Sequence, residues 1–155
     1  MSDSETAAGS PAVAGATFDP AAAGWEPYGD DGFIGLVGPF WARPSGDSYL
    51  YAFKAEPKHH NRRGVVHGGM LMAFADTAFG HAVSMHRKDH YWVTVRLVTD
   101  FLSAAKLGDW VEGTAEVMGI EDDIYTVKGR IWCGDRTIMT GTGVFKTLGK
   151  RPPRR

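Results

Sequence analysis

Two adjacent glycines, Gly68 and Gly69, open an apolar stretch that has the composition of a helix. The first backbone N–H groups of a helix have no partner inside it and lie at the positive end of the helix dipole. Glycine has no side chain, so a ligand can approach such a backbone closely. The pair therefore offers a site for the oxyanion that develops when a carbonyl is attacked, although two glycines can equally form a tight turn at a helix entry.

A carboxylate, Asp76, lies two turns further along the same predicted helix. Its neighbours are apolar: Phe74, Ala75, Ala78 and Phe79. An Asp is rarely buried without a partner or a task, and a positioned carboxylate can serve as a general base. Asp76 is therefore a candidate catalytic group; the alternative is a carboxylate that is solvated or satisfied by Thr77.

The spacing between the glycine pair and this carboxylate constrains any mechanism that uses both. Gly68 and Asp76 are eight residues apart, which is roughly 12 Å along a helix axis. One carbonyl is too small to contact both. If both residues serve one reacting centre, they should come from different chains, and a two-fold dimer with neighbouring central helices would arrange this.

The element that carries both residues is predicted to be one helix from His67 to about His86, with Gly80 as its only break. Apolar residues surround most of its circumference. A helix of this kind must be buried on most sides, so it should lie inside other structure and not on its surface.

Six segments around this helix are predicted to be strands: residues 33–42, 48–55, 91–102, 109–118, 124–133 and 137–147. The links between them have hairpin length, and residues 111–117 alternate between apolar and polar side chains. Two strands, one buried helix and four more strands predict an α+β fold. We expect a curved antiparallel sheet of five or six strands wrapped around one long central helix.

Length and composition indicate one domain. The chain has 155 residues, and its 43% hydrophobic and 23% charged residues exclude wholesale disorder. The domain is expected to span residues 25–148. Residues 1–24 have almost no large side chains and are predicted to be a disordered tail, and residues 149–155 are predicted to be a basic tail.

Charge and cysteine content narrow the class of function. The first 42 residues contain six acids and no Lys or Arg, which leaves the globular part mildly basic. That suits an anionic small ligand but falls short of what nucleic-acid binding usually requires. No stretch approaches the roughly 18 consecutive apolar residues of a membrane helix, and the single cysteine, Cys133, can form no internal disulfide. We expect a cytoplasmic protein without nucleic-acid or membrane partners.

Four residues around the glycine pair carry a family resemblance: Asn61, Gly64, His67 and Asp76. Asn-x-x-Gly-x-x-His-Gly-Gly, followed by Asp seven residues later, resembles the PaaI-like acyl-CoA thioesterases of the hotdog-fold superfamily. Residues 92–95 and 101–109 resemble the third strand of that family and the turn after it. The resemblance covers about residues 33–148.

The resemblance implies hydrolysis of an acyl-CoA thioester to a free acid and coenzyme A. In that scheme the Gly68 N–H polarises the thioester carbonyl, and Asp76 of the other subunit acts as general base or nucleophile. Asn61 helps to hold the attacking water, His67 lies near the thiol leaving group, and Thr94 supports the water from its strand.

Substrate binding and partners follow from the same resemblance. Gly69, Arg62 and Arg63 are candidates for contacting the substrate, and the two arginines could meet the phosphates of coenzyme A, although they could also be solvated. Coenzyme A is part of the substrate, so no separate cofactor is expected. No metal is expected either, because the pair of His59 and His60 lacks a companion carboxylate. The expected partner is a second copy of the chain, in a homodimer or a tetramer built as a dimer of dimers.

Simpler alternatives stay open for the individual residues. His67 could merely cap the helix, Asn61 could stabilise its loop, and Thr94 could be an ordinary strand residue. A second function also stays open, namely a module of the same fold that binds an acyl thioester without cleaving it. A hydratase or dehydratase is less favoured, because the spacing of His81 from Asp76 does not support a joint role.

Other enzyme classes lack their motifs. The sequence has no Gly-x-Ser-x-Gly elbow, no phosphate-binding loop and no dinucleotide fingerprint. Cys133 lies in a predicted strand with no neighbouring base, which argues against a nucleophilic cysteine.

Overall fold

The computed structural model of the chain describes residues 18–88 and 91–149. Most of the predicted N-terminal tail, residues 1–17, and nearly all of the C-terminal tail, residues 150–155, lie outside these ranges. Residues 18–24 belong to the predicted N-terminal tail but form a turn, in which the Asp19 carboxylate accepts a hydrogen bond from the Ala21 N–H at 3.0 Å. Next to this turn, the ring of Phe18 lies 4.7 Å from that of Trp110.

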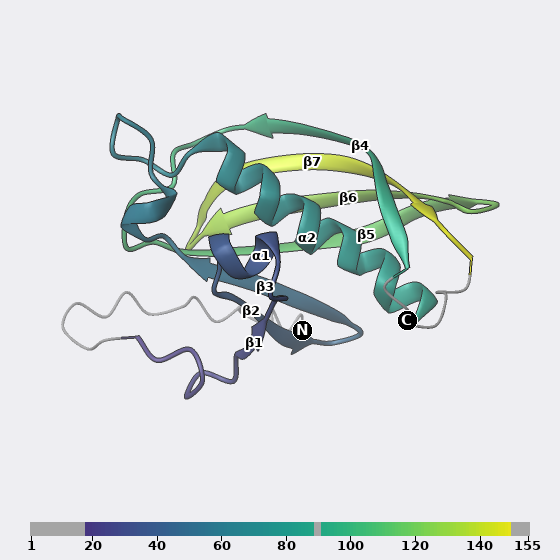
Figure 1. Cartoon of the computed structure of the whole chain (residues 1–155), viewed down its shortest axis with the longest axis horizontal. Coiled ribbons are helices and arrows are strands. Elements are labelled where there is room, and N and C mark those ends of the chain that lie inside the picture. The colour runs from purple at the N-terminus through teal and green to yellow at the C-terminus, as the bar shows by residue number, and fades with distance from the viewer. Residues whose placement is uncertain (1–17, 89–90, 150–155) are drawn as a thin grey trace, which may run out of the picture.

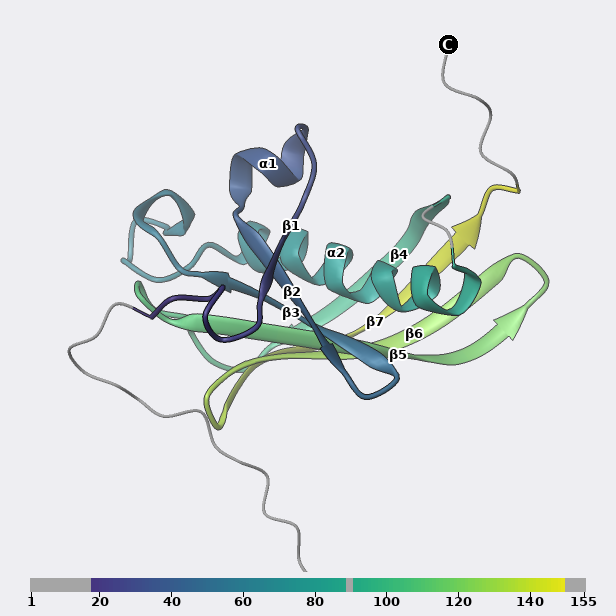
Figure 2. The ribbon, with the colours of Figure 1, turned by 90° about the horizontal axis from the view of Figure 1, so that it is seen from below.

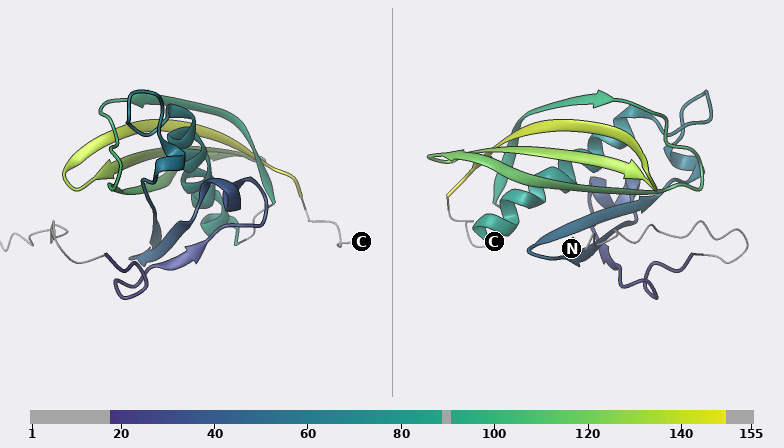
Figure 3. Two further views of the ribbon diagram at one scale, coloured as in Figure 1. Left: turned by 60° about the vertical axis from the view of Figure 1, so that its left-hand side comes forward. Right: turned by 180° about the vertical axis from the view of Figure 1, so that it is seen from behind.

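The described residues form one long helix, α2 (Gly68–Arg87), packed against a curved antiparallel sheet (Figures 1 and 3). The sheet has seven strands: β1 (Glu26–Tyr28), β2 (Phe40–Ser45), β3 (Ser48–Lys54), β4 (Trp92–Phe101), β5 (Trp110–Glu121), β6 (Ile124–Cys133) and β7 (Arg136–Thr147). Their order in the sheet is β1-β2-β3-β5-β6-β7-β4. The predicted α+β arrangement is confirmed. The expected number of five or six strands is too low, because the three-residue strand β1 adds to the edge beside β2.

One predicted strand is wrong in its first half. Residues 33–42 were expected to be extended, but Phe33–Val37 forms a short helix, α1, and β2 begins only at Phe40. The Gly38 N–H closes α1 by donating to the Ile34 carbonyl at 2.7 Å. A short apolar run has no clear period, so its sequence does not distinguish a strand from one turn of helix.

The predicted helix is confirmed almost to the residue, and its packing explains why Gly80 lies within it. A side chain at Gly80 would overlap the Trp92 ring of β4, and one at Gly129 of β6 would overlap the Phe79 ring. Two glycines therefore let aromatic rings lie directly against the helix and the sheet. Phe74, Phe79 and Val83 are fully buried as a result. In the described part of the chain, no helix is long and apolar enough to cross a membrane.

Strand β4 forms the edge of the sheet opposite β1 and lies along one flank of α2. Three side-chain hydrogen bonds join the two elements: Trp92 Nε1–H to Ser84 Oγ at 2.8 Å, Thr94 Oγ1–H to Asp76 Oδ1 at 2.6 Å, and Thr99 Oγ1–H to Met72 Sδ at 2.9 Å. As the residue numbers rise along β4, those of the contacted residues fall along α2, so the two elements are antiparallel. The first residues of β4 therefore lie beside the end of α2, and its last residues lie beside the start of α2.

Candidate active site

His67 is the N-cap of α2. Its Nδ1 accepts a hydrogen bond from the Gly69 N–H at 2.8 Å, and its carbonyl accepts one from the Met70 N–H at 2.9 Å. The simpler alternative for His67, a helix cap, is therefore what the structure shows. The Gly68 N–H has no acceptor within the described residues, and the ring of Phe101 lies beside it, 3.5 Å from where a Gly68 side chain would begin. Of the two glycines, Gly68 is thus the one whose N–H is available.

Asn61 shapes the loop that leads into α2. Its Oδ1 accepts a hydrogen bond from the Arg63 N–H at 2.8 Å, and its own N–H donates to the Val65 carbonyl at 2.8 Å. Gly64 closes this turn with a positive φ of 76°. The side chains of Arg62 and Arg63 project from the turn and are exposed. Asn61 therefore has the loop-stabilising role that was its simpler alternative, and its side-chain NH₂ takes no part in these bonds.

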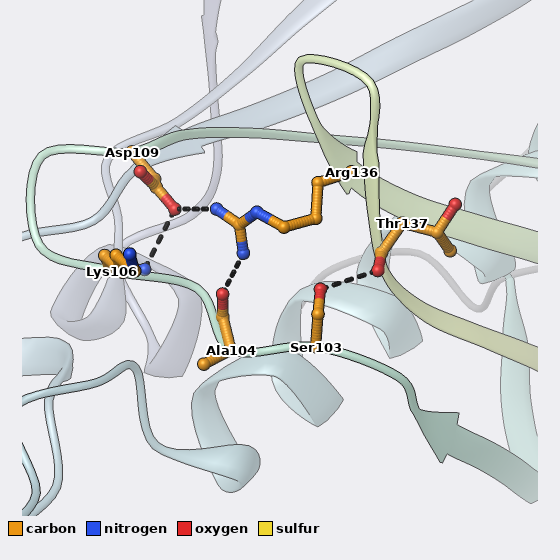
Figure 4. A network of polar contacts seen from close by, with 6 residues as sticks. All are labelled: Ser103, Ala104, Lys106, Asp109, Arg136 and Thr137. Carbon is orange, nitrogen blue, oxygen red and sulfur yellow. Dashed lines mark hydrogen bonds and ion pairs between the residues drawn. The ribbon is translucent and has the colours of Figure 1, made fainter.

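A network of polar contacts in the segment after β4 holds the loop before α2 in place. Figure 4 shows its six residues: Ser103, Ala104, Lys106, Asp109, Arg136 and Thr137. The Arg136 guanidinium donates to Asp109 Oδ2 at 2.8 Å and also to the Ala104 carbonyl, and the Lys106 N–H donates to the same carboxylate oxygen at 2.9 Å. The Val66 N–H then donates to the Ala105 carbonyl at 2.8 Å, which ties the loop before α2 to this turn. Sequence reasoning missed Arg136, because nothing local marks a partner 27 residues away from Asp109.

Asp76 and Thr94, two of the predicted site residues, are in direct contact. The Thr94 hydroxyl donates to Asp76 Oδ1 at 2.6 Å, and the Asp76 side chain is half-buried. Thr77 does not satisfy the carboxylate, since its hydroxyl donates to the Ala73 carbonyl at 3.0 Å. A hydroxyl from the edge strand therefore orients a carboxylate that stays accessible from one side.

The glycine end of the helix and this carboxylate form two separate halves within one protomer. Gly68 lies beside Phe101 at the end of β4, whereas Asp76 lies beside Thr94 near its beginning. Both belong to one continuous helix, so they stay about 12 Å apart along its axis. A single chain does not bring them to one carbonyl.

The remaining candidates lie elsewhere. His81 is buried on another flank of α2, with its ring 4.9 Å from that of Tyr51 of β3, whereas Asp76 faces β4. Burial raises the pKa of the Cys133 thiol, which disfavours the nucleophilic thiolate. Over residues 18–88 and 91–149, no three His, Cys, Asp or Glu side chains gather in a way that could hold a metal ion.

His59, which was considered as a metal ligand and set aside on the sequence, has a structural task. Its Nε2 lies 2.7 Å from the Val37 carbonyl of α1, and its Nδ1 accepts a hydrogen bond from the Glu56 N–H at 3.0 Å. The ring is therefore neutral, with its proton on Nε2. Burial lowers the pKa of this imidazole, an effect that the bond to Val37 partly opposes. The residue ties α1 to η1 (Pro57–His59), the short helix before the loop that leads into α2.

Comparison with known proteins agrees with this fold. The family model of the thioesterase superfamily matches residues 63–140, a range that contains Gly68, Asp76 and Thr94. A Pseudomonas aeruginosa protein named "Putative esterase PA0474" is 33% identical over 114 residues, which are 72% of this chain and 85% of that protein. The chain belongs to the thioesterase superfamily.

Solved structures extend this result to the whole fold. The Escherichia coli PaaI protein, from the phenylacetic acid degradation operon, superposes with a TM-score of 0.67 at 21% identity over 77% of this chain and 86% of that one. Zebrafish thioesterase superfamily member 2 gives 0.68 at 23% identity over 77% and 88%. The Bacillus halodurans protein BH2602, determined with CoA, gives 0.62 at 24% identity over 71% and 74%. These likenesses confirm the hotdog fold for this thioesterase-superfamily chain.

Proposed function

We propose that the protein hydrolyses acyl-CoA thioesters to free acids and coenzyme A, at a site that two protomers build together. The observation that carries the proposal is the hydrogen bond between Thr94 and Asp76 on a thioesterase-superfamily scaffold. Simple binding of an acyl group needs no oriented, accessible carboxylate, whereas attack by water does. The available Gly68 N–H at the start of the same helix supplies the matching oxyanion donor.

The second protomer joins at β4 in this proposal. As an edge strand, β4 leaves one row of backbone N–H and C=O groups without a strand partner among the described residues. It also exposes large apolar side chains: Val93, Val95, Val98 and Phe101. A long apolar edge of this kind favours pairing with another strand, and a second copy of β4 is its natural complement in a two-fold dimer.

In an antiparallel pairing of the two β4 strands around Val98, opposite charges lie across from each other, and residues that face α2 lie across from residues that face the partner's α2. This pairing sets Arg96 opposite the partner's Asp100 and vice versa, so each charge meets its opposite. Thr94 and Phe101 both face α2, as their contacts with Asp76 and Gly68 show. The β4–β7 register is irregular between Thr94 and Arg96, where β4 has one extra residue. If that residue has no opposite residue in the partner strand either, the same pairing sets Thr94 opposite the partner's Phe101.

This register joins the two halves of the site across the interface. The Asp76–Thr94 pair of one protomer comes next to the start of the partner's α2, where the partner's Gly68 offers its N–H. The two-fold axis repeats the arrangement, so one dimer has two sites. Gly68 and Asp76 of one protomer stay about 12 Å apart along the helix axis, but each of them lies next to the other group of the partner.

The chemistry then follows from these groups. The thioester carbonyl oxygen accepts a hydrogen bond from the Gly68 N–H, which stabilises the developing oxyanion by about 3 to 4 kcal/mol. Asp76 takes a proton from water as the new C–O bond forms; the C–S bond then breaks, and the proton passes to the leaving thiolate. In the nucleophilic variant Asp76 itself attacks, and water hydrolyses the resulting anhydride. Thr94 holds the carboxylate in position in both cases.

Residues at the loop and the helix cap have supporting roles in this proposal. The free NH₂ group of Asn61 is available to the attacking water. His67 uses Nδ1 for capping, so its Nε2–H is the group left to face the sulfur. The Gly69 N–H already donates to His67 Nδ1. Gly69 therefore gives the substrate no hydrogen bond, and its lack of a side chain only lets the substrate come close to the backbone. Arg62 and Arg63, exposed at the loop, would meet the phosphates of coenzyme A. A tetramer and a cytoplasmic location stay predictions.

Release of free thiol from a panel of acyl-CoA thioesters tests the proposal. Asp76→Asn should reduce turnover by about 10² to 10⁴-fold, because the base is lost while the side-chain shape is kept. Asp135→Asn, an exposed position in the β6–β7 turn, is the matched control and should keep wild-type activity. Wild-type turnover by Asp76→Asn would refute the role of the carboxylate. Thioester binding without thiol release by the wild-type protein would favour the binding module instead.

A further inference from the structure

The short helix α1 carries the most exposed large apolar side chains of the described residues. Leu36 is 77% exposed and Phe33 is 61% exposed. The other two large side chains within α1, Ile34 and Val37, are partly buried and pack against the core. Figure 2 shows α1 standing over the first half of α2, on the face of α2 away from the sheet. Apolar groups displayed in this way on a small element indicate a contact with something that the single chain does not supply.

A cavity of about 390 Å³ opens beside these side chains. One wall is α1, with Phe33, Leu36 and Val37, and the facing wall is the start of α2, with Gly69 and Met70. His67 and Gly69, the residues immediately before and after Gly68, both line this cavity. The cavity therefore begins next to the Gly68 N–H. A group attached to a carbonyl that is bound at this N–H therefore has the cavity directly in reach.

The charged and titratable side chains of one wall of the cavity, Lys58, His59 and His60, already have partners within the chain. His59 is neutral, because its Nδ1 accepts a hydrogen bond from the Glu56 N–H and burial lowers its pKa. Lys58 contacts the Gly38 carbonyl and lies 3.5 Å from the Glu56 carboxylate. His60 directs Nδ1 toward the Asn61 carbonyl, at 3.1 Å. The polar wall thus offers no unpaired charge for an acyl group that ends in a carboxylate, and the opposite wall is apolar.

From this geometry we infer that the cavity between α1 and the start of α2 holds the acyl group of the substrate, and that Leu36 and Phe33 determine which acyl groups are accepted. The volume lies near the lower end of the roughly 300–1,000 Å³ that is usual for ligand pockets. The substrate class is therefore an uncharged, apolar acyl group of medium length, and neither a very long chain nor a dicarboxylic acid. This inference rests on the proposed thioester hydrolysis, whose carbonyl position at Gly68 it uses.

Changes of side-chain size at Leu36 test the inference. Removing apolar contact through Leu36→Ala should lower kcat/KM for octanoyl-CoA about tenfold and leave acetyl-CoA almost unchanged, since the acetyl group is too short to reach the side chain. Leu36→Trp should fill the cavity and move the preferred chain length toward shorter acyl groups. Leu148→Ala, at a position 41% exposed beyond the end of β7, is the matched control and should keep the wild-type profile.

Two readouts separate this inference from the proposed function. The first is thiol release across straight-chain acyl-CoA thioesters from two to sixteen carbons, together with succinyl-CoA. The second is calorimetric binding of S-octyl-CoA, a thioether that cannot be hydrolysed. A chain-length profile that Leu36→Ala and Leu36→Trp leave unchanged, or shift by the same factor for every thioester, would overturn the cavity assignment while hydrolysis stands. Leu36-dependent binding of S-octyl-CoA by a wild-type protein that releases no thiol would overturn hydrolysis and keep the cavity.

Discussion

The two edges of the sheet differ in length, composition and exposure. At one edge β1 has three residues, one of which is Pro27. At the other edge β4 has ten residues and exposes four large apolar side chains. Proteins protect sheet edges that must stay unpaired by making them short and by placing proline in them. The β1 edge has both features and the β4 edge has neither, so only β4 is suited to pairing with another strand.

This difference matters because both halves of the candidate site lie along the unprotected edge. Thr94, near the start of β4, positions Asp76, and Phe101, at its end, lies beside Gly68. The edge that is open to a partner is therefore also the strand that connects the two halves. If the proposed dimer is right, association and catalysis should fail together when β4 is altered, and neither should respond to β1.

A lysine at the centre of the open edge should have the largest effect. Val98→Lys places two ammonium groups beside each other at the proposed two-fold axis, which costs several kcal/mol. We expect self-association and thiol release both to fall by roughly a hundredfold or more. Val98 is 51% exposed, so the folded chain should tolerate the change. Light scattering and the thiol assay measure the two effects.

Glu26→Lys is the matched control, because Glu26 is an exposed residue of the β1 edge strand. It should leave both mass and turnover unchanged. An active Val98→Lys protein with the mass of a single chain would show that one protomer suffices, and it would end the two-chain site.

Charge exchange on β4 should have a smaller effect and tests the register itself. Arg96→Glu would set a glutamate opposite the partner's Asp100 at two symmetric places. Since cross-strand charge pairs are worth about 0.2–1 kcal/mol each, the dimer dissociation constant should rise roughly tenfold. Combining Arg96→Glu with Asp100→Arg should restore wild-type affinity in sedimentation equilibrium. A double variant no tighter than Arg96→Glu alone would exclude the register centred on Val98.

Acid should have the smallest of these effects, and it should act in part through His59, which binds the Val37 carbonyl of α1. A free histidine titrates near about 6.5, and burial lowers the pKa of His59 in the folded chain. Between these two pKa values the unfolded state binds more protons, so stability rises with pH there. The contribution of His59 is complete above about pH 6.5 and is lost as the pH falls through the lowered folded-state pKa.

Urea unfolding at pH 7.5 and pH 5 measures this contribution. The loss of unfolding free energy between the two values should be smaller in His59→Gln than in the wild type. His60→Gln, at an exposed position next to it, should keep the wild-type difference. Equal pH dependence in the wild type and His59→Gln would mean that the imidazole is not neutral and tied to Val37 as described.

Much of the fold was predictable from the sequence. The helix at residues 68–87 follows from its nearly continuous apolar surface, and the strands after it follow from alternation and short turns. The failures have local causes. Residues 33–37 are too few to show a period, and β1 has only three residues with a proline among them, which is a poor strand signal.

The candidate site was predictable only in part. The glycine pair and the carboxylate could be recognised from their places on one helix, and their separation already indicated two chains. The cap role of His67 and the loop role of Asn61 were weighed as alternatives, and the structure shows both. The link between Asp109 and Arg136 and the task of His59 were missed, because each depends on a partner more than twenty residues away.

The sequence by itself determined which elements form and which groups they carry, because apolar periodicity and glycine positions act over a few residues. Only the tertiary structure decided which of those groups meet. Strict alternation along β4 would put Thr94 on the same face as Arg96 and Val98, away from the helix. The register shift between Thr94 and Arg96 turns the Thr94 hydroxyl toward α2 instead, where it contacts Asp76. That shift depends on the pairing of β4 with β7, about fifty residues further along the chain, so local sequence patterns could not show it.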